Sequence, residues 1–156
     1  MPDKSPFDHL EGPVLVSACL LGISCRYDKG LKTSESILGR KDISFVPVCP
    51  EQLGGLPTPR PPAQFSGGDG RDVLKGRARV IDAGGADVTD AFIEGARQTL
   101  KIARIVGARW AVFKDHSPSC ATRRVWKDGD QVAGIGVTTA LLIDHGISVM
   151  DEEGRL

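Results

Sequence analysis

The stretch that decides the fold is GGADVTDAFIEGARQTLKIARIVG, residues 84–107, followed after Ala108 by RWAVFKD, residues 109–115. Within the first part, apolar residues recur at helical spacing, at Phe92, Ala96, Leu100, Ala103 and Val106. Asp87 or Thr89 can cap the start of this helix, and Gly107 can end it. The second part is a short apolar run typical of a buried strand, so a long amphipathic helix leads directly into sheet.

The same alternation extends in both directions along the chain. Upstream, VLVSACLLG (residues 14–22) and ISFVPVCPE (residues 43–51) are apolar, β-branched runs typical of buried strands. Downstream, GIGVTTALLIDHG (residues 134–146) predicts a helix and ISVMD (residues 147–151) a closing strand. Strands that alternate with helices favour right-handed crossovers. The predicted fold is therefore α/β, a single Rossmann-like domain with a mostly parallel sheet covered by helices on both faces.

The remaining segments give weaker signals. QLGGLPTPRPPAQFSGGDG (residues 52–70) is rich in glycine and proline, which predicts a long irregular loop of the kind often kept for function, or else a plain surface linker. VLKGRARVID (residues 73–82) indicates an exposed strand or hairpin arm. We expect residues 1–13 to be a polar lead-in and residues 14–156 to form the one catalytic domain.

Size and charge exclude several classes of function. With 156 residues, the chain can bury roughly 70% of its unfolded surface in one domain. Twenty basic residues balance twenty acidic ones, which argues against a broad nucleic-acid-binding surface. No apolar run reaches the roughly 18 residues of a membrane span, and the start lacks the apolar core of a secretory signal. We expect a cytoplasmic protein with no membrane segment, and a homo-oligomer stays open.

Four cysteines, Cys19, Cys25, Cys49 and Cys120, carry the chemical signal. In a reducing compartment, free thiols or metal ligands are favoured over two disulfides. Three of them, Cys19, Cys49 and Cys120, lie at or just past the carboxyl end of a predicted strand. Because parallel strands end on the same side of a sheet, and ligands bind beyond those ends, we expect the three thiols to meet at one rim.

Three converging thiols suit a soft metal or an iron–sulfur cluster. Structural zinc usually takes four ligands, often from C-x-x-C pairs, and the sequence contains no such pair. A 4Fe-4S cluster held by three cysteines leaves one iron that can act as a Lewis acid toward a substrate heteroatom. Cys25, in the polar loop GISCRYDKG, is either a thiol near the site or a fourth ligand. Three ligands would indicate catalysis, and four would indicate electron transfer or structure.

Several longer motifs point to a family. SACLLGISCRYD, PVCPEQLGGLPTPR, DVTDAFIEGA, FKDHSPSC and GIGVTTALL together resemble the small thiouracil desulfidases of the TudS type, over residues 14–149. The resemblance implies that Cys19, Cys49 and Cys120 bind a 4Fe-4S cluster whose remaining iron takes the sulfur of a thiolated pyrimidine. Water would then replace the sulfur with oxygen. The resemblance also implies a proton-handling pair, Glu51 and Ser117.

The residue types agree with this chemistry. Attack of water on a thiocarbonyl carbon needs a nearby base, and a carboxylate two residues after a ligand cysteine would be held near the cluster. We therefore expect Glu51 to be the base, the alternative being a solvated carboxylate or a helix cap. Ser117 could orient the substrate or relay a proton, although Ser-Pro is also ordinary turn chemistry. A lone loop histidine, His116, is expected to be solvated rather than catalytic.

Other positions are candidates for binding. Arg26, Tyr27 and Arg60 could contact the pyrimidine or the cluster sulfides. The N–H groups of GIGVTT (residues 134–139), at the start of a helix, could hold an anionic group. Ala121 stands where the family usually has glycine, so either the backbone there needs no positive φ or the loop is altered.

The leading hypothesis is a cytoplasmic 4Fe-4S enzyme that removes sulfur from a thiolated pyrimidine such as 2-thiouracil and releases sulfide. Its expected partner is the small-molecule substrate. Two alternatives stay open at this point. The enzyme could act on another thioamide, a thionucleoside or a modified tRNA base, or the domain could bind an iron–sulfur cluster or zinc without turnover.

Overall fold

A parallel sheet forms the centre of the molecule, in a computed structural model that describes residues 4–30 and 32–156. The four strands run in the order β2-β1-β5-β8, and all neighbouring pairs are parallel. They are β1 (Pro13–Ser17), β2 (Ser44–Val48), β5 (Trp110–Phe113) and β8 (Ser148–Asp151). Each coincides with an apolar run that predicts a strand, and the α/β class is confirmed.

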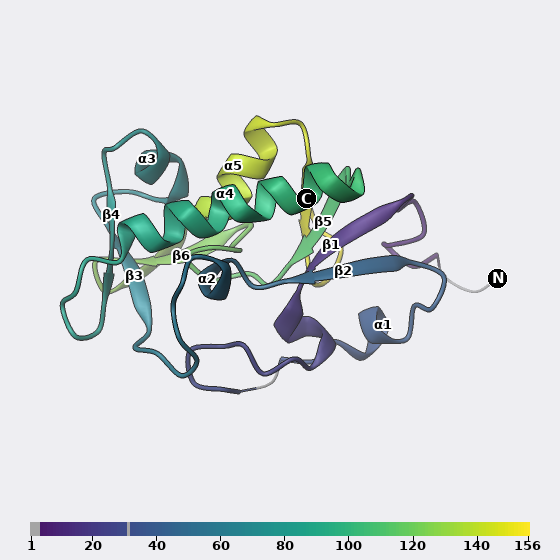
Figure 1. The fold of residues 1–156 in the computed structure, drawn as a ribbon, viewed down its shortest axis with the longest axis horizontal. Helices are drawn as coiled ribbons and strands as arrows, with labels where there is room; N and C mark the ends of the chain where they lie inside the picture. Colours follow the sequence, from purple (N-terminus) through teal and green to yellow (C-terminus); the bar gives the residue numbers. More distant parts are fainter. Residues whose placement is uncertain (1–3, 31) are drawn as a thin grey trace.

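Two helices, α4 (Thr89–Val106) and α5 (Val137–Asp144), lie together on one side of this sheet (Figure 1). Alternate strand residues such as Leu15 and Phe113 are fully buried beneath them, in one cluster with Leu100 of α4. As the sequence predicts, α4 ends before Gly107, which adopts a left-handed φ of 71°. Within the described part of the chain, no helix is long and apolar enough to cross a membrane.

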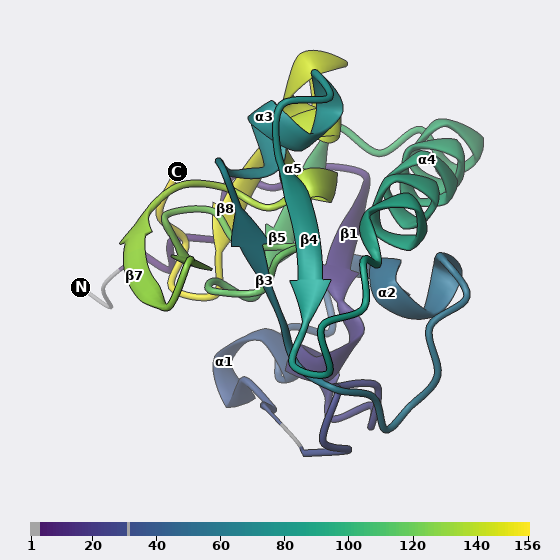
Figure 2. The ribbon, with the colours of Figure 1, turned by 90° about the vertical axis from the view of Figure 1, so that its left-hand side faces the viewer.

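Short elements cover the opposite face of the parallel sheet. They are the 3₁₀ turn η1 (Ala18–Leu21), the single-turn helix α1 (Glu35–Leu38) and the segment before β1, from which Phe7 enters the core with 2% of its surface exposed. Val14 and Val16 point to this side because successive strand residues alternate between faces. Figure 2 shows α1 and α4 on different sides of β1. The long helices thus cover one face, and turns cover the other.

The sequence does not predict the second sheet, whose strands run in the order β4-β3-β6-β7. Its members are β3 (Ala63–Ser66), β4 (Arg79–Asp82), β6 (Arg124–Lys127) and β7 (Asp130–Ala133). The stretch expected to be an irregular loop contains β3 and leads into α3 (Gly70–Leu74), which starts with a capping box at Asp69. The fold therefore has two sheets, where the sequence predicts one.

Helix α2 (Pro50–Leu53) follows β2 and packs directly on α4. Two glycines make this possible, because a Cβ on Gly95 would overlap the Pro50 carbonyl oxygen, and one on Gly54 would overlap the Ala91 carbonyl oxygen. Glycine allows such close backbone approach because it has no side chain. The contact fixes the turn that carries Glu51.

Replacing Gly95 by Ala tests this contact. The added methyl group must displace the backbone of α2, so we expect the free energy of unfolding to fall by about 1–3 kcal/mol, despite the higher helix propensity of alanine. Lys101→Ala, on the exposed face of the same helix, is the control, with an expected change within about 0.5 kcal/mol. Denaturant unfolding measures both. Equal stabilities of the Gly95→Ala protein and the parent would contradict the close approach.

Candidate functional site

A cavity of about 370 Å³ lies at the carboxyl edge of the parallel sheet. All four cysteines line it, and so do Glu51 and Ser117. Cys19 lies in η1 just after β1, Cys49 directly follows β2, and Cys120 lies in the loop after β5. The structure therefore brings every predicted site residue to one place.

All four thiols are free, and the Cys49 thiol donates to the Cys25 carbonyl at 3.7 Å. The neighbouring Cys19 thiol, together with burial, raises the pKa of Cys25 to about 11. The neighbouring Cys25 thiol, together with burial, raises the pKa of Cys49 well above its usual range. Burial raises the pKa of Cys120 to about 12. Because thiolates are the metal-binding form, any metal centre here must displace protons.

The donor set suits a thiolate-ligated centre, since soft ligands select iron–sulfur clusters, zinc and copper(I). Among residues 4–30 and 32–156, no three His, Cys, Asp or Glu side chains are arranged as they stand to hold a metal ion. Cys25, which the sequence leaves open as a ligand, is buried within the cysteine group rather than in a solvated loop.

Glu51 is held at the cavity wall by two side chains. Arg60 Nε lies 3.4 Å from Glu51 Oε1, and the Ser119 hydroxyl donates to Glu51 Oε2 at 3.2 Å. The Ser117 and Ser119 hydroxyl oxygens are 2.9 Å apart. Ser117 thus reaches the carboxylate through Ser119, which also lies 3.6 Å from Cys120 Sγ. Sequence reasoning missed Ser119, although it stands beside Ser117 and Cys120 in the motif SPSC, residues 117–120.

The SPSC loop is built against the start of α5. The Val137 N–H donates to the Pro118 carbonyl at 2.8 Å, and the Thr138 N–H donates to the Ser119 carbonyl at 3.0 Å. A Cβ on Gly136 would overlap the Ser119 carbonyl oxygen. The N–H groups of Val137 and Thr138, part of the GIGVTT segment that the sequence offers as an anion site, therefore bind the loop that carries Cys120.

Ala121 fits this loop without a left-handed backbone. The non-glycine residues with positive φ in the described chain are Lys29, His116 and Asp128. The Ala121 side chain is fully buried in the core of the second sheet, together with Phe65. Of the two explanations for the missing glycine, the structure supports the first, in which no positive φ is needed there.

Asp115 anchors the backbone on both sides of the SPSC motif. Its Oδ1 accepts the backbone N–H groups of His116, Thr122, Arg123 and Arg124 at 2.9–3.2 Å. Burial alone would raise the pKa of Asp115, but these donors outweigh it and hold the pKa below the ordinary value of 3.8. Next to it, His116 has a φ of 78°, a conformation that costs a non-glycine residue energy.

Asp115→Asn tests this anchor. An amide oxygen accepts weaker bonds than a carboxylate, so we expect a loss of about 2–4 kcal/mol in the free energy of unfolding at neutral pH. Because the native pKa is lowered, the stabilisation is fully present above pH 3.8 and is lost as the pH falls through the native pKa. Denaturant unfolding at several pH values measures this. A stability difference that did not shrink in acid would contradict it.

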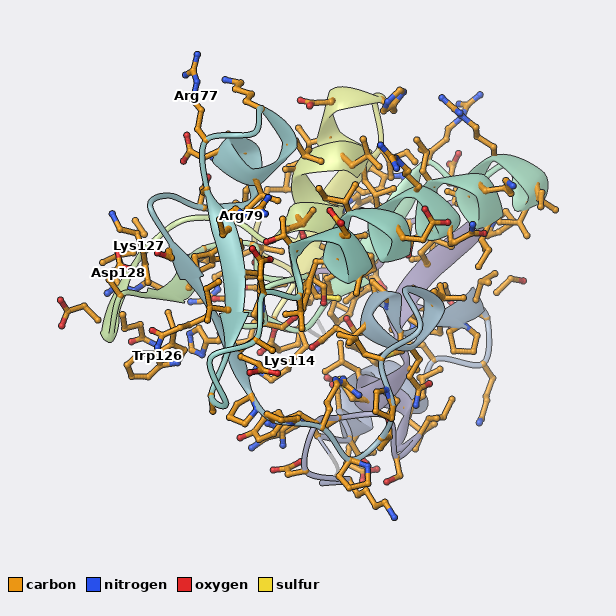
Figure 3. All side chains as sticks on the ribbon, turned by 60° about the vertical axis from the view of Figure 1, so that its left-hand side comes forward. Arg77, Arg79, Lys114, Trp126, Lys127 and Asp128 are labelled. Atoms are coloured by element: carbon orange, nitrogen blue, oxygen red, sulfur yellow. The ribbon has the colours of Figure 1, made fainter. Side chains whose placement is uncertain are left out.

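Basic and aromatic side chains form the outer wall of the cavity. Trp126 of β6 is 48% exposed, and Lys114 Nζ pairs with Glu152 at 2.8 Å. Figure 3 labels both residues and shows the Trp126 ring at the edge of the molecule. The binding candidates Arg26 and Tyr27 also line the cavity, with the Arg26 guanidinium 5.4 Å from the centre of the Tyr27 ring.

A thiol-lined cavity with a carboxylate and hydroxyls in its wall, at the carboxyl edge of a parallel sheet, defines a protein that can hold a thiolate-bound centre beside a small molecule. Residues 14–154 match the model of the 2-thiouracil desulfurase family, and the chain belongs to this family. The resemblance inferred from the sequence motifs is thereby confirmed.

Two individual proteins are also similar. The uncharacterized protein YbbK of Bacillus subtilis (strain 168) is 43% identical over 143 residues, which cover 89% of this chain and 95% of YbbK. The solved structure of the 4Fe-4S-dependent thiouracil desulfidase TudS is 40% identical, with a TM-score of 0.78 and 91% of each chain covered. Together with the family match, these findings support the expected enzyme class, an iron–sulfur-dependent desulfidase.

Proposed function

We propose that this protein is a 4Fe-4S-dependent desulfidase that replaces the sulfur of a thiolated pyrimidine, such as 2-thiouracil, by oxygen from water. The observation that carries the proposal is the meeting of Cys19, Cys49 and Cys120 with Glu51 and Ser117 in one cavity. The TudS likeness, over 91% of the chain, adds the cofactor and the substrate class.

Cys19, Cys49 and Cys120 hold the cluster in this proposal. Each follows a strand of the parallel sheet, whereas Cys25 lies in the loop between β1 and α1 and lines the same cavity as the three ligand thiols. Side chains that surround the ligand sulfurs are a common way of tuning such centres. When bound, a cluster with three protein ligands supplies a Lewis-acidic iron open to a substrate sulfur. A volume near 370 Å³ lies within the usual range of small-molecule sites.

Glu51 and the two serines handle protons. The Glu51 carboxylate, aligned by Arg60 and Ser119, takes a proton from the water that attacks the thiocarbonyl carbon. Ser117 exchanges that proton with Glu51 through the Ser119 hydroxyl. Over the whole reaction the carbon–sulfur bond breaks, a carbon–oxygen bond forms and hydrogen sulfide leaves, so no electrons are transferred to or from the substrate.

Anaerobic reconstitution with iron and sulfide tests the cluster assignment. We expect four irons per chain and conversion of 2-thiouracil to uracil and sulfide. Cys19→Ser, Cys49→Ser and Cys120→Ser should each lose most of the bound iron, because each removes a ligand. Cys25→Ser should retain it. Loss of iron in Cys25→Ser as well would make Cys25 a ligand, and a parent protein that binds no iron would reject the proposal.

Glu51→Gln tests the base. The amide cannot take a proton, so we expect kcat to fall about 100- to 10,000-fold, with the iron content and the absorption spectrum unchanged. Glu35→Gln, at an exposed position of α1, is the matched control and should keep full activity. Steady-state assays with a panel of thiolated bases and nucleosides measure kcat and the substrate preference. Undiminished turnover in Glu51→Gln would remove Glu51 from the mechanism.

A further inference from the structure

Arg60 makes several hydrogen bonds in addition to its contact with Glu51. Its side chain is 4% exposed, although it comes from the glycine- and proline-rich segment between α2 and β3. Besides its contact with Glu51, Nη2 donates to the Cys25 carbonyl at 3.0 Å, and Nη1 donates to the Pro57 carbonyl and to Thr58 Oγ1, both at 3.0 Å. The guanidinium therefore joins three separate stretches of chain.

These bonds leave the guanidinium little capacity for a ligand. Arginine has five side-chain N–H groups, and four protein acceptors are within hydrogen-bonding distance of them. A buried arginine is stable only when its donors are satisfied and its charge is paired. Inside the protein, Arg60 has acceptors for four of its five N–H groups and a carboxylate for its charge, so its contacts indicate a role in the arrangement of the wall rather than in recognition of the pyrimidine.

The contacts divide the Glu51 carboxylate between two anchors. Oε1 lies against Arg60, while Oε2 accepts from Ser119. With one anchor on each oxygen, rotation of the carboxylate breaks at least one of the two bonds. Without Arg60, only Ser119 would hold a side chain that is 16% exposed and open to the cavity.

Arg60 also fixes the cysteine-bearing loop relative to Glu51. The Cys25 carbonyl that accepts from Arg60 lies 3.7 Å from Cys49 Sγ and 3.4 Å from Thr58 Oγ1. The backbone N–H of Arg60 donates to the Tyr27 carbonyl at 2.7 Å. The carboxylate and the loop with Cys25 therefore share one rigid, planar partner.

We propose that Arg60 is a positioning residue that fixes the Glu51 carboxylate in its working orientation relative to the cysteine group. The inference rests on the proposed function, because Arg60 acts through Glu51. Lysine cannot replace it, since a single ammonium cannot reach Glu51, Cys25 and Pro57 together in the planar fork geometry.

Kinetics of the reconstituted full-length protein test the assignment. Arg60→Met should bind iron as the parent does, with KM nearly unchanged and kcat lowered about 10- to 100-fold, because a misplaced base slows the step without weakening substrate binding. Arg60→Lys, which keeps the charge, should not recover the parent kcat. Arg40→Met is the matched control: Arg40 pairs with Asp8 and Asp42 outside the cavity, and its loss should leave kcat unchanged.

Rescue of kcat by added guanidinium distinguishes a positioning role of Arg60 from a purely structural one. In Arg60→Ala, guanidinium can occupy the vacated volume, and we expect it to restore part of kcat. It should have no such effect on the Glu51→Gln, Arg60→Ala double variant. A raised KM with parent kcat in Arg60→Met would overturn the inference and make Arg60 a substrate-binding residue. Full activity in Arg60→Lys would overturn it as well.

A double-mutant cycle separates this inference from the proposed function. Denaturant unfolding of metal-free parent, Arg60→Met, Glu51→Gln and the double variant measures the coupling between the two side chains without any turnover. Non-additive stabilities support the pairing even if the parent converts no thiouracil, an outcome that would reject the desulfidase proposal alone. Additive stabilities overturn the role of Arg60, whatever the enzyme does.

Discussion

The parallel pairing of β1 with β2 and β5 is the constraint on which the site depends. Ser17 lies opposite Val48, so Cys19 and Cys49 leave the sheet at the same edge, and Val112 of β5 lies opposite Val16. The Lys114 N–H donates to Ser17 Oγ at 2.9 Å and continues the contact beyond β5. A slip of one residue would exchange the two faces of a strand, which would put Leu15 where Val14 and Val16 now pack. The buried core thus fixes the register, and the register brings the thiols together.

Outside the sheet, hydrogen bonds to the backbone hold the loop that carries Cys120 and the two serines. Asp115 holds one end of the SPSC loop with four accepted N–H bonds, and the first N–H groups of α5 hold its middle. Ser117 Oγ accepts the N–H groups of Ser119 and Cys120 at 3.1 and 3.0 Å. A loop restrained in this way can present Cys120 and Ser119 in fixed directions before any ligand binds, which lowers the reorganisation that binding requires.

How much of this the sequence predicts depends on the range of the interactions. Helix α4 and the four strands of the parallel sheet are predictable because periodic apolar residues mark their buried faces, as Phe92 and Leu100 do on α4. Strand β3 is four residues long with Phe65 alone fully buried, too short for alternation to show, and its pairing partners are distant in sequence. The sequence gives no sign of the contacts of Ser119 and Arg60 with Glu51, and it marks Arg60 only as a binding candidate, for a related reason. Their contacts depend on how three loops meet, and no local pattern encodes that.

The charges around the cavity affect the pKa values of the cysteines. Neighbouring thiols and burial raise the pKa of Cys25 and Cys49, burial raises the pKa of Cys120, and the charge of Glu51 adds to the rise for Cys49 and Cys120. Arg60 acts in the opposite direction on Cys25. Binding a thiolate-ligated centre replaces several protons by negative charge in a poorly solvated volume, which is costly unless cations lie nearby. Arg26, Arg60 and Lys114 line that volume. Arg60 thus contacts the Glu51 carboxylate and also lowers the pKa of the Cys25 thiol beside the ligand cysteines, so the geometry of the base and the electrostatics of its surroundings share one residue.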